Sequence, residues 1–138
     1  MLLVGVGLGG GLATALSLVT WACRSSLVSV LTSSPEVQLA AVGVMPAVLV
    51  TQVLKGLAYP ANAVLMGGKD WLASTLAMWA SSAVLVYLLA SGTFGPPSLR
   101  SVWSALAACF AMQIGTALGR VTTRTGPWRA LRKRRRAE

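Results

Sequence analysis

Histidine is absent from this 138-residue chain, and only three residues are acidic. These are Glu36, Asp70 and Glu138, and each lies in a predicted loop or at the terminus, where a carboxylate caps a helix or is solvated. Catalysis needs a base, a nucleophile or a metal held in mutual reach. Cys23 and Cys109 lie in apolar segments without metal-ligand spacing, as small packing residues do. We therefore expect no enzyme activity, no catalytic residue, no metal and no bound cofactor.

Charged residues of either sign are also scarce. They make up 11% of the chain, whereas 55% of the residues are hydrophobic. A soluble domain of this length usually carries about a quarter charged residues. The composition predicts an all-α integral membrane protein.

The net charge of +9 comes mainly from one end of the chain. Basic residues crowd behind the last apolar segment, and this placement is typical of the positive-inside bias of membrane proteins. Aromatic side chains do not alternate with these arginines, so we expect no nucleic-acid partner. Residues 129–138 are predicted to be a disordered tail that contacts anionic lipid headgroups. The residues expected to make this contact are Arg132, Lys133, Arg134, Arg135 and Arg136.

Four apolar segments remain, at about residues 2–23, 37–66, 71–90 and 99–121. Crossing a bilayer takes about 20 residues, so these predict four transmembrane helices within a membrane region of residues 1–128. The first contains GVGLGGGLA, whose small residues allow a neighbouring helix to approach closely. The second should be capped by Ser33 or Ser34 and kinked at Pro46 and Pro60. Asp70 is predicted to cap the third.

The distribution of basic residues predicts the orientation. Four crossings place the tail and the turn at Lys69 on one side, and Arg24 and Arg100 on the other. The more basic tail side should face the cytosol, or the stroma if the membrane is a plastid envelope. The plasma membrane and an organelle membrane both stay open.

The second crossing contains an unusual polar stripe. Gln52, Lys55, Tyr59 and Asn62 are spaced by three, four and three residues, which places them along one side of a helix. A lysine in the middle of a crossing costs about 2.5–3.5 kcal/mol on insertion scales and often marks a functional site. The stripe is predicted to line a hydrated cavity that binds substrate. The alternative is that Lys55 extends its amine to the membrane surface.

Three stretches resemble the C-terminal third of multidrug and toxic compound extrusion (MATE) transporters, in the branch of bacterial damage-inducible and plant plastid members. They are LTSSPEV (31–37), MPAVLVTQVLKGLAYPANAVLMGGKD (45–70) and GRVTTRTGPW (119–128). In that family F-T-S-D-P-x-V joins helices nine and ten. Helix ten carries Q-P-x-x-x-x-x-x-x-D/E-G-x-L-x-G-x-x-D. The resemblance implies that the four crossings are helices nine to twelve, within a C-terminal six-helix lobe.

The resemblance further implies an antiporter that exports small organic compounds in exchange for protons or sodium. The chain would be a fragment, inactive alone, whose partners are lipid and the remaining helices or another copy. It departs from the family where Gln52-Val53 replaces Q-P and where Asn62 replaces the acidic residue, so coupling at Asn62 is in doubt. We expect Lys55 to favour an anionic substrate. The alternative is a small four-helix scaffold or regulatory subunit with a lipid-contacting basic tail.

Overall fold

The computed structural model describes residues 2–123 and 125–128. Within them the chain forms helices and no strands. The helices are α1 (Leu2–Ala22), α2 (Arg24–Leu31), α3 (Pro35–Gly67), α4 (Trp71–Ala90) and α5 (Leu99–Thr122), followed by the short 3-10 helix η1 (Gly126–Trp128). The all-helical prediction is confirmed, and the four long helices begin and end within two residues of the expected positions.

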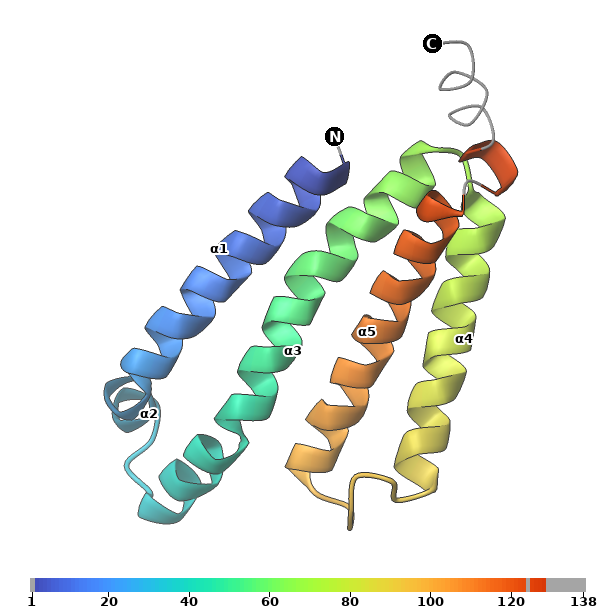
Figure 1. Ribbon diagram of the computed structural model, residues 1–138. Helices are drawn as coiled ribbons and strands as arrows, with labels where there is room; N and C mark the ends of the chain where they lie inside the picture. Colours follow the sequence, from blue (N-terminus) through green and yellow to red (C-terminus); the bar gives the residue numbers. More distant parts are fainter. Residues whose placement is uncertain (1, 124, 129–138) are drawn as a thin grey trace.

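The four long helices stand side by side in the order α1, α3, α5, α4 (Figure 1). Helix α3 packs against α1 on one side and α5 on the other, and α4 packs mainly against α5. The start of α1, the α3–α4 turn and the end of α5 lie at one end of the row, which we call the turn end. Helix α2 and the α4–α5 loop lie at the opposite end, which we call the loop end. This is the arrangement that four alternating crossings require.

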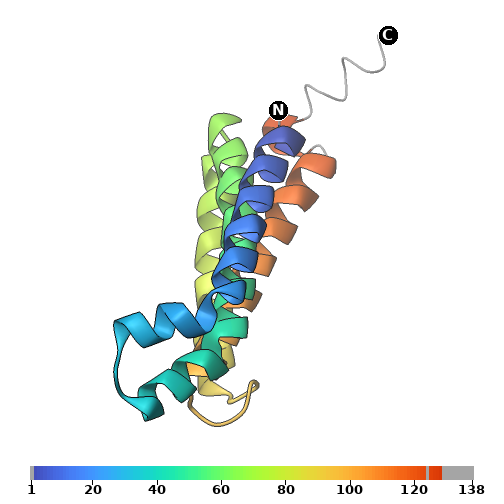
Figure 2. The ribbon, with the colours of Figure 1, turned by 90° about the vertical axis from the view of Figure 1, so that its left-hand side faces the viewer.

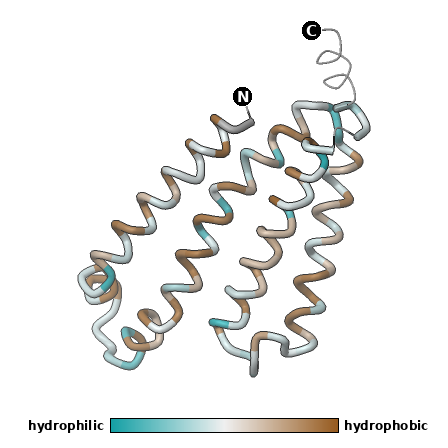
Figure 3. The backbone as a smooth tube through the Cα atoms, viewed as in Figure 1, coloured by the Kyte–Doolittle hydropathy of each residue, from teal (hydrophilic) through white to brown (hydrophobic). Residues whose placement is uncertain are grey.

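Large apolar side chains cover the outside of the row. Each long helix is long and apolar enough to cross a membrane, and hydrophobic residues recur along all four (Figure 3). Leu8, Leu39, Leu72 and Trp79 are among the most exposed apolar residues, whereas the buried ones are mostly alanines. A water-soluble monomer rarely exposes apolar patches of this extent. Small residues inside and large apolar residues outside are what packing in lipid favours.

Helix α2 was not predicted. Its sequence RSSLVSVL is too short to cross a membrane, and the helix runs across the axis of the bundle at the loop end (Figure 2). Val28 is buried, whereas Val30 and Leu31 are 86% and 83% exposed. A short helix with exposed apolar residues and this orientation is suited to lie along the membrane surface.

Helix α3 is longer than predicted, with 33 residues that begin at Pro35 and end at Gly67. Ser34 is its N-cap residue, as expected, but the Ser34 side chain makes no capping hydrogen bond. At 1.5 Å per residue the helix measures about 50 Å, compared with about 30 Å for the bilayer core. Its first turns bend away from the rest of the helix (Figures 1 and 2). Pro46 and Pro60 both lie inside α3, and the kinks at these two residues stay predictions.

Helices α1 and α3 approach each other at glycines. A Cβ atom added to Gly9 would lie 2.6 Å from the carbonyl oxygen of Gly56, and one added to Gly56 would lie 2.5 Å from the Cβ atom of Ala13. A Cβ atom on Gly10 would collide with Leu57. The glycine run therefore provides the close approach that the sequence predicted.

Candidate functional site

The four stripe residues lie on α3 as predicted, but they do not share one environment. Gln52 is exposed, Lys55 is half-buried, Tyr59 is 57% exposed and Asn62 is only 6% exposed. With 3.6 residues per turn, spacings of three, four and three rotate the stripe by about 80° from its first to its last residue. The stripe therefore turns from the outside of the row at Gln52 toward α5 at Asn62.

Lys55 and Tyr59 form the outer part of the site. The Lys55 Nζ atom lies 5.7 Å from the centroid of the Tyr59 ring, within the range of a cation–π contact. The Tyr59 ring in turn meets Phe110 of α5 edge to face, with centroids 6.4 Å apart and planes at 87°. No carboxylate of the described residues lies within 4.0 Å of the Lys55 amine. The ion pair found among these residues joins Asp70 and Arg120 at the turn end. Among the described residues, the Tyr59 ring is the partner found for the Lys55 amine.

Asn62 begins a buried network that joins three helices. Its Nδ2 atom donates a hydrogen bond to Oε1 of Gln113 on α5, at 2.9 Å. The Nε2 atom of Gln113 donates to Oγ of Ser81 on α4 at 3.2 Å, and it lies 3.7 Å from Sγ of Cys109. Asn62, Ser81 and Cys109 are all buried. Gln113 thus connects α3 to α4 through α5, in the middle of segments that are otherwise apolar.

The sequence reasoning missed Gln113 and Ser81. Gln113 is the one amide within the fourth apolar segment, and its occurrence there is the signal that could have found it. A buried amide costs free energy unless it is hydrogen-bonded, so a partner on a facing helix was to be expected. Ser81 gives no such signal, because a serine in a helix often bonds to its own backbone. Its hydroxyl does so here, by donating to the carbonyl oxygen of Met78 at 3.0 Å.

A groove of about 510 Å³ opens beside this network. Its lining combines two aromatic rings, two methionines and several polar groups, contributed by α3, α4 and α5. The lining residues are Tyr59, Asn62, Ala63, Met66, Met78, Ser82, Phe110 and Gln113. We call this space the polar groove. Aromatic and thioether surfaces with a few converging hydrogen-bonding groups are typical of sites for small organic molecules.

A second polar cluster lies at the turn end. Nε of Arg120 donates to Oδ2 of Asp70 at 2.9 Å, and the Nη1 atom of Arg120 donates to Oγ1 of Thr125 at 3.1 Å. The prediction that Asp70 caps α4 needs correction. Asp70 does occupy the N-cap position, but its carboxylate makes no capping hydrogen bond and pairs with Arg120 of α5. The Asp70 carboxylate is used for a tertiary ion pair with a cation of another helix.

The hydrogen bond from Arg120 lowers the pKa of Asp70 below its ordinary value. Burial raises the pKa, because the side chain is only 5% exposed, but the hydrogen bond from Arg120, aided by its charge, outweighs this effect. The indole ring of Trp128 in η1 covers the α3–α4 turn, where a Cβ atom on Gly68 would collide with it. The cluster therefore fastens the end of α5 to the start of α4.

The tail residues Arg132, Lys133, Arg134, Arg135 and Arg136 lie outside the described residues. Cys23 is exposed and Cys109 is buried, and both are free thiols. Among residues 2–123 and 125–128, no three or more histidine, cysteine or acidic side chains gather closely enough to hold a metal ion.

Comparisons with known proteins do not assign the chain to a family. No family model matches the sequence, and neither a curated protein nor a solved structure matches it significantly.

Proposed function

We propose that the chain crosses a membrane four times and forms part of a secondary active transporter for small organic compounds. The polar groove carries this proposal. It brings an amide network and two aromatic rings together on helices that are apolar enough to cross a membrane, and Lys55 lies beside one of these rings. Polar groups within membrane segments are costly and tend to mark substrate or ion pathways.

Lys55 points to the charge of the substrate. Tyr59 contacts both Lys55 and Phe110, so the amine lies beside the groove and not in an isolated part of the helix. A positive charge without a neighbouring carboxylate favours an organic anion and opposes an organic cation. We propose an aromatic carboxylate as the substrate class, with its ring against the Tyr59 and Phe110 side chains and its carboxylate toward Lys55.

The resemblance to MATE transporters agrees with this proposal and adds export in exchange for protons or sodium. Asn62 does not supply the coupling charge, because an amide neither takes up a proton nor carries a formal charge. Its hydrogen bond to Gln113 gives it a different task, which is to hold one wall of the polar groove in place. The outer faces of α3 and α4 beside the groove would be covered by further helices or by another copy of the chain.

Transport in membrane vesicles from the native host tests the proposal, since such vesicles contain the protein with its partners. Two labelled probes are compared, an aromatic carboxylate and an aromatic quaternary ammonium ion of similar size. Vesicles from the parent strain should transport the carboxylate faster. Lys55→Gln should lower its initial rate about tenfold, because hydrogen bonds to charged groups contribute roughly 1.5–3 kcal/mol.

Two variants control for unspecific effects of charge. Lys69→Gln removes a lysine from the α3–α4 turn, outside the polar groove, and should leave carboxylate transport unchanged. Lys55→Arg keeps the charge and should retain most of the activity. If Lys55→Gln and Lys69→Gln give equal rates, the anion preference is wrong. If deleting the gene changes the transport of neither probe, the transporter proposal itself fails for these substrates.

A further inference from the structure

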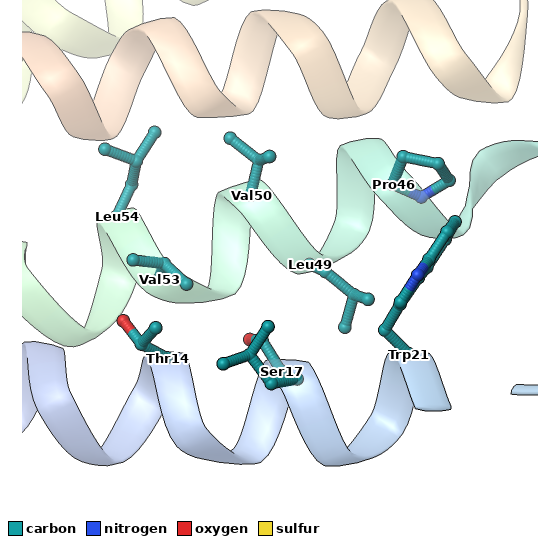
Figure 4. Close-up of a pocket in the computed structure, with 9 residues that line it drawn as sticks. Thr14, Ser17, Trp21, Pro46, Leu49, Val50, Val53 and Leu54 are labelled. Carbon is teal, nitrogen blue, oxygen red and sulfur yellow. The ribbon is translucent and has the colours of Figure 1, made fainter. Parts of the chain in front are cut away.

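A second groove, distinct from the polar groove, lies between α1 and α3 at the loop end. Its volume is about 400 Å³. Figure 4 shows the Trp21 ring of α1 beside Pro46 of α3, with Leu49 directed from α3 toward α1. Thr14, Ser17 and Val53 extend the lining toward the middle of the helices. We call this space the α1/α3 groove.

The lining of the α1/α3 groove is almost entirely apolar. The hydroxyl of Thr14 donates to the carbonyl oxygen of Gly10 in its own helix, at 2.7 Å, so its hydrogen is already used. Seven residues separate Thr14 from Trp21, which corresponds to about 10 Å along the helix axis. A site of this length and composition matches part of an acyl chain and offers little to a polar ligand.

A fixed positive charge lies at the outer end of the groove. The guanidinium carbon of Arg24 is 4.4 Å from the centroid of the Trp21 ring. Nη1 of Arg24 donates to the carbonyl oxygen of Trp21 at 3.0 Å. Arginine has five N–H donors, so most remain for another partner. No carboxylate of the described residues lies within 4.0 Å of this guanidinium.

The depth of Arg24 fits a phospholipid headgroup. Arg24 is the first residue of α2, the helix that runs across the bundle axis where the membrane surface would lie (Figure 2). The groove leads from this level toward the middle of α1 and α3. Arg24 therefore lies at the depth of a lipid phosphate, and the apolar groove lies at the depth of an acyl chain. An anionic phospholipid has its phosphate and its acyl chain in this same order.

We propose that the α1/α3 groove binds one acyl chain of an anionic phospholipid whose phosphate is held by Arg24. Guanidinium groups bind phosphate oxygens through paired hydrogen bonds, and Trp21 holds this guanidinium in place. The site rests on the membrane-crossing part of the proposed function and is independent of transport. If the protein binds the phospholipid but transports neither probe, the transporter proposal is wrong and the lipid site is unaffected.

Native mass spectrometry of the intact protein tests the site. The protein is released from nanodiscs that contain equal amounts of phosphatidylglycerol and phosphatidylcholine, and the retained lipid is identified by mass. The parent protein should retain phosphatidylglycerol preferentially. Arg24→Ala should lower this preference about fivefold, the effect expected of one basic residue near anionic lipid. Arg100→Ala, an exposed arginine at the same end of the bundle, is the matched control and should change nothing.

The groove itself is tested by filling it. Leu49 lines the α1/α3 groove and is directed from α3 toward α1 (Figure 4), so Leu49→Trp fills the space that an acyl chain would occupy. It should abolish lipid retention, whereas Val86→Trp on the exposed side of α4 should not. Circular dichroism identifies variants that fail to fold. The proposal is overturned if Arg24→Ala retains as much phosphatidylglycerol as the parent, or if Arg100→Ala lowers retention equally. It is also overturned if the protein is released as a dimer without lipid, because a second copy would then cover the groove.

Discussion

The two sides of α3 are packed by different means. Toward α1 the helix meets glycines, and no hydrogen bond joins the two helices among the described residues. Toward α5 it uses polar groups, because Asn62 donates to Gln113 and the hydroxyl of Thr51 lies 3.1 Å from the carbonyl oxygen of Trp103. One side depends on close contact of backbones and the other on specific donors and acceptors.

This difference shows how helices associate when lipid replaces water. Burying an apolar side chain gains little there, because lipid tails are as apolar as leucine. Association then depends on van der Waals contact, which glycine maximises, and on hydrogen bonds. Glycine contacts determine how closely two helices approach, but they do not require particular side chains to pair. The amide network does require this, because each donor must face its acceptor. The groups that we propose to bind the transported substrate lie at the second kind of contact, where the positions of side chains are better defined.

The largest effect should come from enlarging a glycine in the α1–α3 contact. Gly9→Leu forces a side chain against the backbone of Gly56, where even a Cβ atom would be only 2.6 Å from the carbonyl oxygen. Overpacking of this kind costs about 1–3 kcal/mol. Thermal unfolding in detergent micelles should show the loss. The matched control is Gly11→Leu, because nothing lies within 4 Å of its added Cβ atom.

Equal destabilisation by the two glycine variants would mean that backbone contact does not hold α1 to α3. We expect the control to be neutral or slightly stabilising, since leucine is a better helix former than glycine.

A smaller effect should follow from breaking the amide network. Gln113→Leu removes the bonds to Asn62 and Ser81 and leaves the buried Asn62 amide without its partner. Hydrogen bonds between transmembrane helices average about 0.6 kcal/mol and reach about 1.7 kcal/mol, so we expect a loss in this range. Gln52→Leu makes the same substitution at an exposed position of α3 and should not destabilise the protein.

The double variant Asn62→Leu with Gln113→Leu sharpens this test. If the two amides act on each other, the double variant should be less destabilised than the sum of the single variants. Strict additivity would show that the hydrogen bond between them adds nothing to the contact of α3 with α5.

The long helices could be predicted from the sequence because their signals are local. Each helix begins and ends where an apolar run begins and ends. Gly67 ends α3, Asp70 precedes α4, and a polar loop precedes Leu99 at the start of α5. The boundary at α5 is further fixed by a capping box, in which the side chains of Ser98 and Ser101 accept hydrogen bonds from each other's backbone amides. Helix α2 was missed because its eight residues lack both the length and the apolar content of a crossing.

The candidate site was predicted only in part, because side-chain partners depend on how helices are rotated against each other. Lys55 and Asn62 stand out as polar residues in an apolar segment, and spacing alone places them on α3. Spacing does not show that Asn62 faces Gln113, or that the Tyr59 ring meets Phe110. Asp70 was assigned to a cap because its local sequence permits one, and a cation 50 residues away took its carboxylate.

The smallest effect should come from the pair at the turn end, where more than a third of the Arg120 side chain is exposed. Arg120 lowers the pKa of Asp70 in the folded protein below the ordinary value of 3.8. Well above pH 3.8, Asp70 is ionised in both the folded and the unfolded protein, and the ion pair contributes fully to stability. Below this pH the unfolded chain takes up a proton first, so stability falls until the pH passes the folded pKa. Thermal unfolding from pH 7 to pH 3 should show this loss.

Asp70→Asn removes the charge at every pH and should abolish the acid-dependent part of the profile. Glu36→Gln removes an exposed carboxylate from the first turn of α3 and should keep the pH dependence of the parent. The same titration on Gly9→Leu should run parallel to the parent curve at lower stability, because the α1–α3 contact contains no titratable pair. Curves that converge at low pH would instead show that the α1–α3 contact is coupled to the ion pair between Asp70 and Arg120.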